Sequence, residues 1–227
     1  MSYLLHIANK NYSSWSLRPW VLMRALGIPF REQLHRLGTE DFTRFSPSGR
    51  VPCLSDGDTS VWDSLAIVEY LAEHHAGVWP SDAGARAWAR SAAAEMHSSF
   101  AVLRNQHGMN VGVRVVVPQR SAALQADIDR ILELWHDGLG RFRGPWLAGA
   151  EFSAVDSFYA PVAFRFRSYG VALAGPAAGY LQRLLAHPAM QDWEAAALAE
   201  DFRETEHEGE LASAGRVVAD FRVLPRT

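Results

Sequence analysis

Residues 50–71 of the chain read RVPCLSDGDTSVWDSLAIVEYL. Two short apolar runs in this stretch flank a turn at Gly57, and this arrangement predicts a β-hairpin. Apolar residues then recur at helical spacing over 64–75, with Asp63 or Ser64 as the helix cap. The stretch therefore predicts two antiparallel strands followed directly by a helix.

The residues before this stretch extend the pattern towards the N-terminus. They predict a strand at 3–7, a helix at 17–26, a strand at 30–37 and a short helix at 39–45. Ser16 is the expected cap of the first helix, Pro19 is expected in its first turn, and Gly27 is expected to end it. The expected order of elements up to residue 75 is therefore βαβαββα.

After this unit the strand signal nearly vanishes. Helices are predicted at 86–106, 119–142, 153–169, 177–186 and 188–198. The β-branched run at 111–117 has no partner nearby and is predicted as a loop, and the tail from Glu204 shows no clear pattern. The sequence therefore predicts a small α/β domain at 1–78, a linker at 79–85 and an all-α domain at 86–227.

The composition is that of a folded globular chain. Hydrophobic residues make up 48% of the 227 residues, which excludes a mostly disordered chain. The formal net charge of −3 provides no basic field, so nucleic acid is not expected as a partner. No apolar run reaches the ~18 residues of a membrane span. Residues 1–7 do not resemble a secretion signal, so we expect neither a membrane span nor export.

Cys53 is the single cysteine of the sequence. The chain therefore cannot form an intramolecular disulfide, and this suits a reducing compartment such as the cytoplasm. The place of Cys53 in an apolar strand predicts a buried, inert thiol. The histidines show no metal-ligand spacing with Cys or acidic residues, so no metal is expected.

Three stretches together resemble a known family. They are YSSWSLRPW at 12–20, RVPCL at 50–54 and DSLAIVEYL at 63–71. In this order and spacing they resemble the soluble glutathione S-transferases, and FSAVD at 152–156 resembles the helix cap of that family's C-terminal domain. The paired serines resemble the zeta class and its bacterial relatives, which include maleylacetoacetate isomerases, although Trp15 stands where the zeta pattern has a cysteine. The resemblance implies a thioredoxin-like N-terminal domain, a helical C-terminal domain, a cis bond before Pro52 and a twofold homodimer.

The resemblance also implies glutathione as co-substrate, and the serines suit its thiol. A free thiol has a pKa of about 8.5, yet only the thiolate is a good nucleophile. A hydroxyl that donates a hydrogen bond to sulfur favours the thiolate, as do the free N–H groups of a helix N-terminus. By position in the zeta-type pattern we expect Ser13 to be this donor, with Ser14 as the second candidate. Arg18 is the nearest cation and is expected to bind glutathione, by steadying the loop or the thiolate. Helix capping alone is the alternative role of the serines.

The other two stretches suit the remaining groups of glutathione. The resemblance places Arg50, Val51 and Pro52 beside the peptide, and the Val51 backbone can pair with the cysteinyl unit like a short extra strand. Ser64 suits the γ-glutamyl carboxylate at a helix N-terminus, and Asp63 suits the α-amino group or orients Ser64. The alternatives are a proline that merely begins a strand and an ordinary helix cap without a ligand.

The predicted helical domain offers candidates for a second-substrate site. They are Arg104, Asn105, Arg165 and Tyr169, and a solvated or salt-bridged side chain is the alternative for each. The predicted function is a cytoplasmic transferase that conjugates the glutathione thiolate to small electrophiles, as in detoxification. The alternatives are a cis–trans isomerase of maleylacetoacetate type and a non-catalytic binding protein of the same fold.

Overall fold

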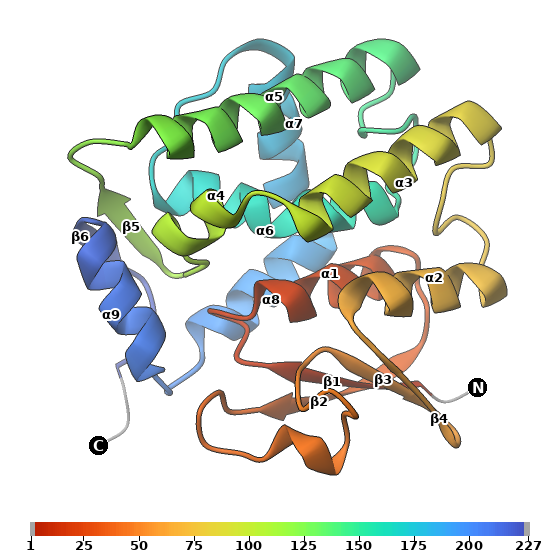
Figure 1. The fold of residues 1–227 in the computed structure, drawn as a ribbon, viewed down its shortest axis with the longest axis horizontal. Coiled ribbons are helices and arrows are strands. Elements are labelled where there is room, and N and C mark those ends of the chain that lie inside the picture. Colours follow the sequence, from red (N-terminus) through yellow and green to blue (C-terminus); the bar gives the residue numbers. More distant parts are fainter. Residues whose placement is uncertain (1–2, 225–227) are drawn as a thin grey trace.

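The computed structural model describes residues 3–224 (Figure 1). Its N-terminal part contains a four-stranded sheet with the strand order β2-β1-β3-β4. The strands are β1 (Tyr3–Ala8), β2 (Phe30–His35), β3 (Cys53–Asp56) and β4 (Thr59–Trp62). β1 runs parallel to β2 and antiparallel to β3, and β3 and β4 form the predicted hairpin. The mixed sheet of the predicted α/β unit is confirmed.

Two helices, α1 (Ser14–Ala25) and α2 (Ser64–His74), cover one face of this sheet (Figure 1). Leu5 and Leu54 from the strands are fully buried in this layer, together with Val21 from α1. Burial of each such side chain stabilises the fold by about 1.5–3 kcal/mol. The opposite face of the sheet carries His6, on which Phe45 stacks at 4.3 Å between ring centroids. Phe45 follows the short 3-10 helix η1 (Phe42–Arg44), which replaces the predicted helix at 39–45.

A helical layer follows the sheet. Its helices are α3 (Ala83–Ser98), α4 (Ala101–Gln106), α5 (Ala122–Phe142), α6 (Ala154–Ser168), α7 (Gly175–Leu185), α8 (Pro188–Leu198) and α9 (Thr205–Ala214). α6 is the centre of this layer, because nearly all of its side chains are buried and both α1 and α3 pack on it. Asp156 in its first turn accepts hydrogen bonds from the Ser153 backbone N–H and the Tyr180 hydroxyl, both at 3.0 Å. The predicted cap at 152–156 is therefore present in the hydrogen bond from the Ser153 N–H to the Asp156 side chain, and this bond fixes the start of α6.

The first helix begins earlier than predicted. Ser13, not Ser16, is the N-cap of α1, and Ser14 is its first residue. The Ser16 hydroxyl instead accepts a hydrogen bond from the backbone N–H of Ala8 at 3.2 Å, so it joins the helix to β1. Pro19 lies inside the helix and not in its first turn. This correction places Ser13 and Ser14 at the N-terminus of α1.

The predicted helix at 86–106 is divided into α3 and α4. Phe100 lies between them with a left-handed backbone, at φ 60°, and a residue in this conformation cannot continue a right-handed helix. The Phe100 side chain is buried in the core. The division therefore ends α3 at Ser98 and makes α4 a separate helix that packs against α5 and α9.

The prediction of a loop at 111–117 is wrong. Val113–Val116 form β5, which pairs antiparallel with β6 (Arg216–Asp220) in a separate two-stranded sheet. The partner strand β6 lies about 100 residues further along the sequence, so no local pattern predicts that it pairs with β5. The tail from Glu204 thus forms α9 and β6, which lie together beside the helical layer (Figure 1).

Within residues 3–224, no helix is long and apolar enough to span a bilayer. The segment between α2, which ends at His74, and α3, which begins at Ala83, contains most of the proposed linker at 79–85. The domain boundaries at 78 and 86 stay predictions.

Candidate functional site

The loop between β1 and α1 carries the paired serines. The backbone N–H groups of Tyr12 and Ser13 both donate to the carbonyl of Asn9, at 3.1 and 2.8 Å, and form a tight turn. The Ser13 hydroxyl donates to the Ser16 hydroxyl at 2.7 Å, so no side chain caps the N–H groups of α1. The helix therefore presents partial positive charge at its start.

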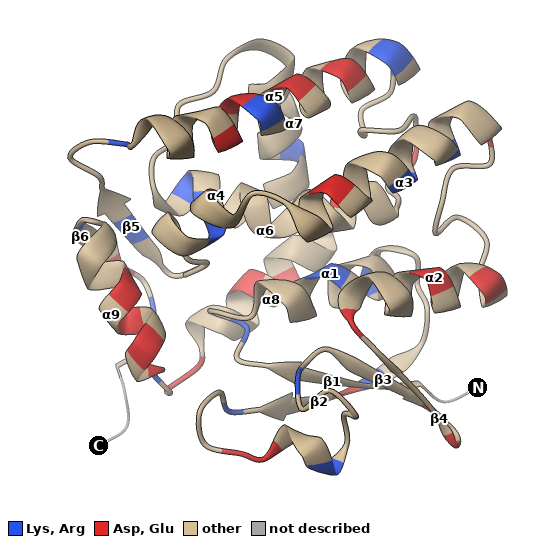
Figure 2. Ribbon diagram, in the orientation of Figure 1, with Lys and Arg blue, Asp and Glu red and all other residues tan. Residues whose placement is uncertain are grey.

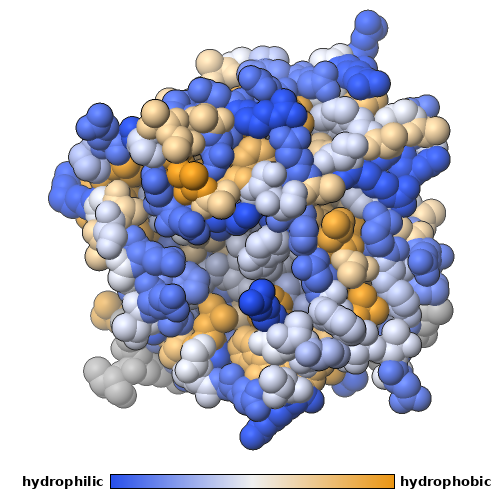
Figure 3. Space-filling model, in the orientation of Figure 1, coloured by the Kyte–Doolittle hydropathy of each residue, from blue (hydrophilic) through white to orange (hydrophobic). Residues whose placement is uncertain are grey.

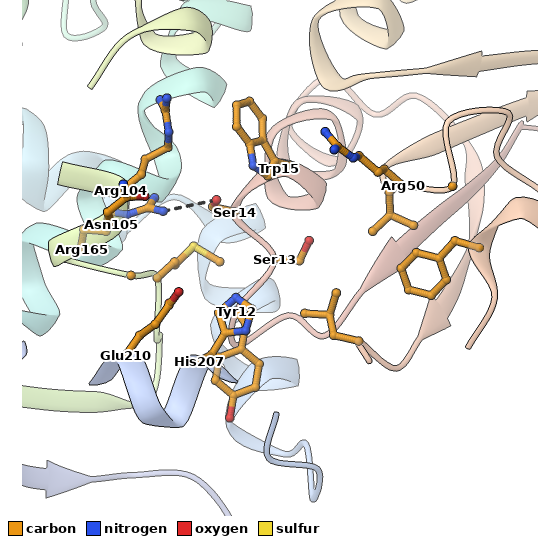
Figure 4. A pocket seen from close by; sticks show the side chains of 16 residues that line it. Tyr12, Ser13, Ser14, Trp15, Arg50, Arg104, Asn105, Arg165, His207 and Glu210 are labelled. Atoms are coloured by element: carbon orange, nitrogen blue, oxygen red, sulfur yellow. Dashed lines mark hydrogen bonds between the residues drawn. The ribbon is translucent and has the colours of Figure 1, made fainter. Parts of the chain in front are cut away.

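Ser14 has a different environment from Ser13. Its hydroxyl oxygen accepts a hydrogen bond from Arg165 Nη2 at 3.4 Å (Figure 4). Arg165 is itself held by a bond of 2.8 Å from its Nε to the His107 carbonyl. Among residues 3–224 no acceptor takes the Ser14 hydroxyl hydrogen, so this hydrogen is available to a ligand.

A cavity of about 420 Å³ opens beside these serines. We call it the serine cavity, and it is lined by Tyr12, Ser13, Ser14, Trp15, Leu37, Phe42, Gly49, Arg50, Val51, Arg104, Asn105, Gly108, Met109, Arg165, His207 and Glu210. These residues come from the start of α1, the segment before β3, α4, α6 and α9 (Figure 4). The face of the molecule seen in Figure 3 is hollowed near its middle.

A second cavity of about 420 Å³ adjoins the first. We call it the aspartate cavity, and it is lined by Trp15, Ser48, Arg50, Val51, Pro52, Trp62, Asp63, Ser64 and His97. Trp15, Arg50 and Val51 line both cavities. The two cavities together form one elongated site between the sheet and the helical layer.

The backbone at Val51 is open to a ligand. The Val51–Pro52 peptide bond is cis, as the resemblance implied. Neither the N–H nor the C=O of Val51 has a hydrogen-bond partner among residues 3–224. An extended peptide in the site can therefore pair with both groups.

The start of α2 combines a strained residue with an unpaired hydroxyl. Asp63 has φ 73°, which is unusual for a residue other than glycine and is typical of binding sites. Its Oδ1 accepts from the Leu65 N–H at 2.8 Å and caps the helix. The Ser64 hydroxyl is buried without a hydrogen-bond partner, so a ligand oxygen can satisfy it.

Arg18 lines neither cavity, contrary to the expectation that it contacts glutathione. It is buried, with its guanidinium 4.1 Å from the Trp15 ring centroid and 4.9 Å from that of Phe158. Burial, and then the nearby Arg165 and Arg104, lower the pKa of Arg18 to about 9. Arg18 therefore contacts Trp15, which lines both cavities, without lining either cavity itself.

Three of the four candidates for the second substrate meet in the serine cavity, namely Arg104, Asn105 and Arg165. The alternative of a solvated or salt-bridged side chain does not apply to Arg165, which is 4% exposed and forms no ion pair within residues 3–224. Burial is the main cause that lowers the pKa of Arg165 to about 10, and Arg104 acts in the same direction. Tyr169 lies outside both cavities and stacks on His107 at 4.2 Å between ring centroids.

The C-terminal tail closes the serine cavity and was not predicted to do so. α9 supplies His207 and Glu210 to the wall. The Tyr12 hydroxyl donates to Glu208 at 2.8 Å, and Arg222 binds the same carboxylate. Figure 2 shows the acidic residues along α9, with basic residues on the neighbouring ends of α4 and α6. The tail is thus fastened beside the serines by charged hydrogen bonds.

His97 is another lining residue that the sequence did not reveal, because it lies on α3 outside any recognised motif. Cys53 is fully buried, as predicted, and burial raises the pKa of its thiol. No cluster of His, Cys, Asp or Glu suited to a metal ion occurs in the described part of the chain.

Two family models match the sequence. One, described as glutathione S-transferase, N-terminal domain, matches residues 12–74, and one described as glutathione S-transferase, C-terminal domain, matches residues 118–197. Together they cover more than half of the chain.

Curated relatives carry related names. The glutathione S-transferase GstB of Escherichia coli strain K12 is 32% identical over 145 residues, which cover 58% of this chain and 65% of that protein. A zeta class glutathione S-transferase of Euphorbia esula is 29% identical over 126 residues, or 54% and 56% of the two chains. A dichloromethane dehalogenase of Methylophilus leisingeri is 53% identical, over 54 residues that cover 21% of this chain and 20% of that protein. The chain thus spans less than two thirds of each of these relatives.

Solved structures share the fold. A glutathione transferase from Methylococcus capsulatus superposes with a TM-score of 0.66 at 24% identity, covering 86% of this chain and 98% of that one. A glutathione transferase homologue from Burkholderia, with bound glutathione, gives a TM-score of 0.65 at 22% identity and covers 87% and 98%. At these identities the solved structures show only that the fold is shared. The two family models match the amino-acid sequence and therefore show the family. The chain belongs to the glutathione S-transferase family.

Proposed function

We propose that the protein is a glutathione-dependent transferase that conjugates the glutathione thiolate to small electrophiles. One observation carries this proposal. The serine and aspartate cavities adjoin at Val51, and the unpaired Val51 backbone groups and Ser64 hydroxyl are complementary to the backbone and the carboxylate of a γ-linked tripeptide. Family membership and the glutathione bound in the Burkholderia homologue support the same ligand.

Glutathione would lie along both cavities. Its γ-glutamyl end suits the aspartate cavity, where the Ser64 hydroxyl would bind the α-carboxylate and Asp63 the α-ammonium. Its cysteinyl unit would pair with the free backbone groups of Val51. Arg50, which lines both cavities, is the cation available for the glycyl carboxylate.

We propose Ser14 as the donor to sulfur, in place of Ser13. The Ser13 hydroxyl hydrogen is already given to Ser16 at 2.7 Å. The Ser14 hydroxyl keeps its hydrogen free, and the bond that it accepts from Arg165 polarises it and strengthens it as a donor. The uncapped N–H groups of α1 add to the stabilisation of the thiolate.

The thiolate would attack an electrophilic carbon and form a carbon–sulfur bond. In a substitution the electron pair of the broken bond departs with the leaving group, and in an addition to a conjugated double bond the adjacent carbon takes up a proton. The bound sulfur starts as a thiolate, so the step requires no general base.

The second substrate is expected to carry an anionic group. Arg104 and Arg165 both line the serine cavity, and neither has a carboxylate partner within the described residues. Arg165 is buried and Arg104 is half-buried. Asp127 and Glu210 act on their charges only from a distance, so a carboxylate on the electrophile would be a direct partner for both. The same pair favours a second candidate function, a cis–trans isomerase, in which the thiolate adds to a conjugated, carboxylate-bearing substrate and is expelled after rotation. A homodimer, a cytoplasmic location and a role in detoxification stay predictions.

The test compares Ser14→Ala with Ser13→Ala, which removes a hydroxyl of nearly equal burial. Loss of a hydrogen bond to a charged group lowers the rate by roughly 10- to 100-fold, so we expect this loss in kcat/KM for an activated aryl halide with Ser14→Ala. We also expect a higher pKa of the bound thiol, measured by thiolate absorbance. A larger loss with Ser13→Ala would reassign the donor to Ser13. Absence of glutathione binding at millimolar concentration by calorimetry would refute the proposed function.

A further inference from the structure

The aspartate cavity contains a residue to which the proposed function gives no role. His97 projects from α3 into the wall of this cavity, and 24% of its side chain is exposed. Its ring lies edge-on to Trp15, with 5.3 Å between ring centroids. Its Nε2 lies 3.6 Å from Asp63 Oδ2. His97 is therefore the side chain of the helical layer that faces the carboxylate at the start of α2.

The two oxygens of Asp63 have separate partners. Oδ1 accepts the Leu65 N–H at 2.8 Å and is committed to the cap of α2. Within residues 3–224, Oδ2 has only the 3.6 Å contact with His97 Nε2. Because Oδ1 is engaged, Oδ2 is the oxygen available to a cationic group of a ligand.

We propose that His97 is a positioning residue that controls how strongly Asp63 binds the α-ammonium group of glutathione. This inference rests on the proposed function. With a neutral imidazole, Asp63 Oδ2 keeps its full charge for the ligand. With a protonated imidazole, His97 forms an ion pair with the same oxygen and repels the ammonium group, so that glutathione binds more weakly.

The charged groups around His97 come from three elements. Asp63 at the start of α2 favours the protonated imidazole, whereas Arg18 from α1 and Arg104 from α4 oppose it. Burial is the largest influence and lowers the pKa of His97. The imidazole is therefore neutral near pH 7 and takes up a proton in acid.

The coupling between the two sites is reciprocal. If protonation of His97 weakens the binding of an ammonium group, the bound ammonium group must lower the pKa of His97 by the same free energy. A ligand without the α-amino group provides no such coupling. This difference separates an effect through Asp63 from any general effect of acid on the cavity.

The experiment is calorimetry between pH 7.5 and pH 5 with two ligands. One is S-methylglutathione, whose blocked sulfur removes thiol ionisation, and the other is the same compound without its α-amino group. We expect the affinity of the wild-type protein for S-methylglutathione to fall about 2- to 5-fold in acid, the upper part of the range of a partly exposed ion pair. The deaminated ligand should change less than about twofold. His97→Gln should remove the acid loss, and the control His207→Gln, in the serine cavity, should keep it.

Two results would overturn the inference: an equal acid loss for both ligands, or an acid loss that persists in His97→Gln. Failure of both ligands to bind at pH 7.5 would instead refute the proposed function. A titration of the His97 ring protons by NMR needs no variant. It should show a lower pKa with S-methylglutathione than with the deaminated ligand, and equal values would contradict the inference.

Discussion

Replacement of Arg165 by methionine should separate fold stability from substrate recognition. Arg165 is buried, and its strong hydrogen bond is the 2.8 Å contact with the His107 carbonyl. Such a charged bond stabilises the fold by about 1.5–3 kcal/mol. Against it, the fall of the Arg165 pKa from its ordinary value to about 10 corresponds to roughly 3 kcal/mol that opposes the charged state. The two contributions nearly cancel, so we expect Arg165→Met to change the free energy of unfolding by less than about 1.5 kcal/mol.

The same substitution should have a large and selective effect on activity. With a chloronitrobenzene that carries a carboxylate, we expect kcat/KM to fall about 10- to 100-fold, because one buried charge–charge contact is lost. With the uncharged chloronitrobenzene, kcat/KM should fall by no more than about fivefold. This smaller loss is the effect of Arg165 on the Ser14 hydroxyl alone. Urea denaturation and steady-state kinetics measure the two effects.

Arg167→Met is the matched control for this prediction. Arg167 lies on the same helix, lines neither cavity and pairs with Glu194 at 2.7 Å. The control should leave the preference between the two electrophiles unchanged. Equal losses for both electrophiles with Arg165→Met would refute the role of Arg165 in anion binding. A loss of several kcal/mol in stability would refute the balance of energies described above.

Two further predictions concern buried titratable groups. The pKa of His107 is lowered to about 4 by burial and by Arg120 and Arg165, so the unfolded chain binds the proton more tightly. Stability should therefore be full above pH 6.5 and fall by roughly 2–3 kcal/mol as pH drops towards 4; urea denaturation should show a smaller fall in His107→Leu. Cys53→Ala should leave kcat/KM unchanged, since the thiol is buried and donates to the Phe45 carbonyl at 3.4 Å. Rapid labelling of native Cys53 by a thiol reagent would contradict that burial.

Much of the fold is predictable because its signals are local. The hairpin around Gly57 and the cap at Asp63 depend on neighbouring residues, and both appear where the sequence predicts them. The pairing of β5 with β6 is not local, since its strands come from distant parts of the chain. The break at Phe100 was also missed, because the apolar periodicity continues across a residue whose backbone turns left-handed.

The candidate site shows the same contrast between features set by neighbouring residues and features set by distant ones. Val51 and Ser64 could be selected from sequence because each lies in a short motif. The preference between Ser13 and Ser14 could not, since it depends on a hydroxyl three residues away and on Arg165, which comes from α6. His97 could not be selected either, because its relevance arises from proximity to Asp63 and not from its sequence neighbours.

The attachment of the tail has a consequence for how substrate preference can diverge within this fold. The Tyr12 hydroxyl is held by Glu208 and Arg222, so it is not free to take over the role of the adjacent serines. In the proposed function, the serines and the helix start that meet sulfur are encoded near the N-terminus, with Arg165 of α6 as their support, while part of the wall that meets the electrophile is encoded in α9. We therefore expect that exchange of α9 for a different terminal segment changes which electrophiles the proposed transferase accepts, while the groups proposed to activate sulfur stay in place.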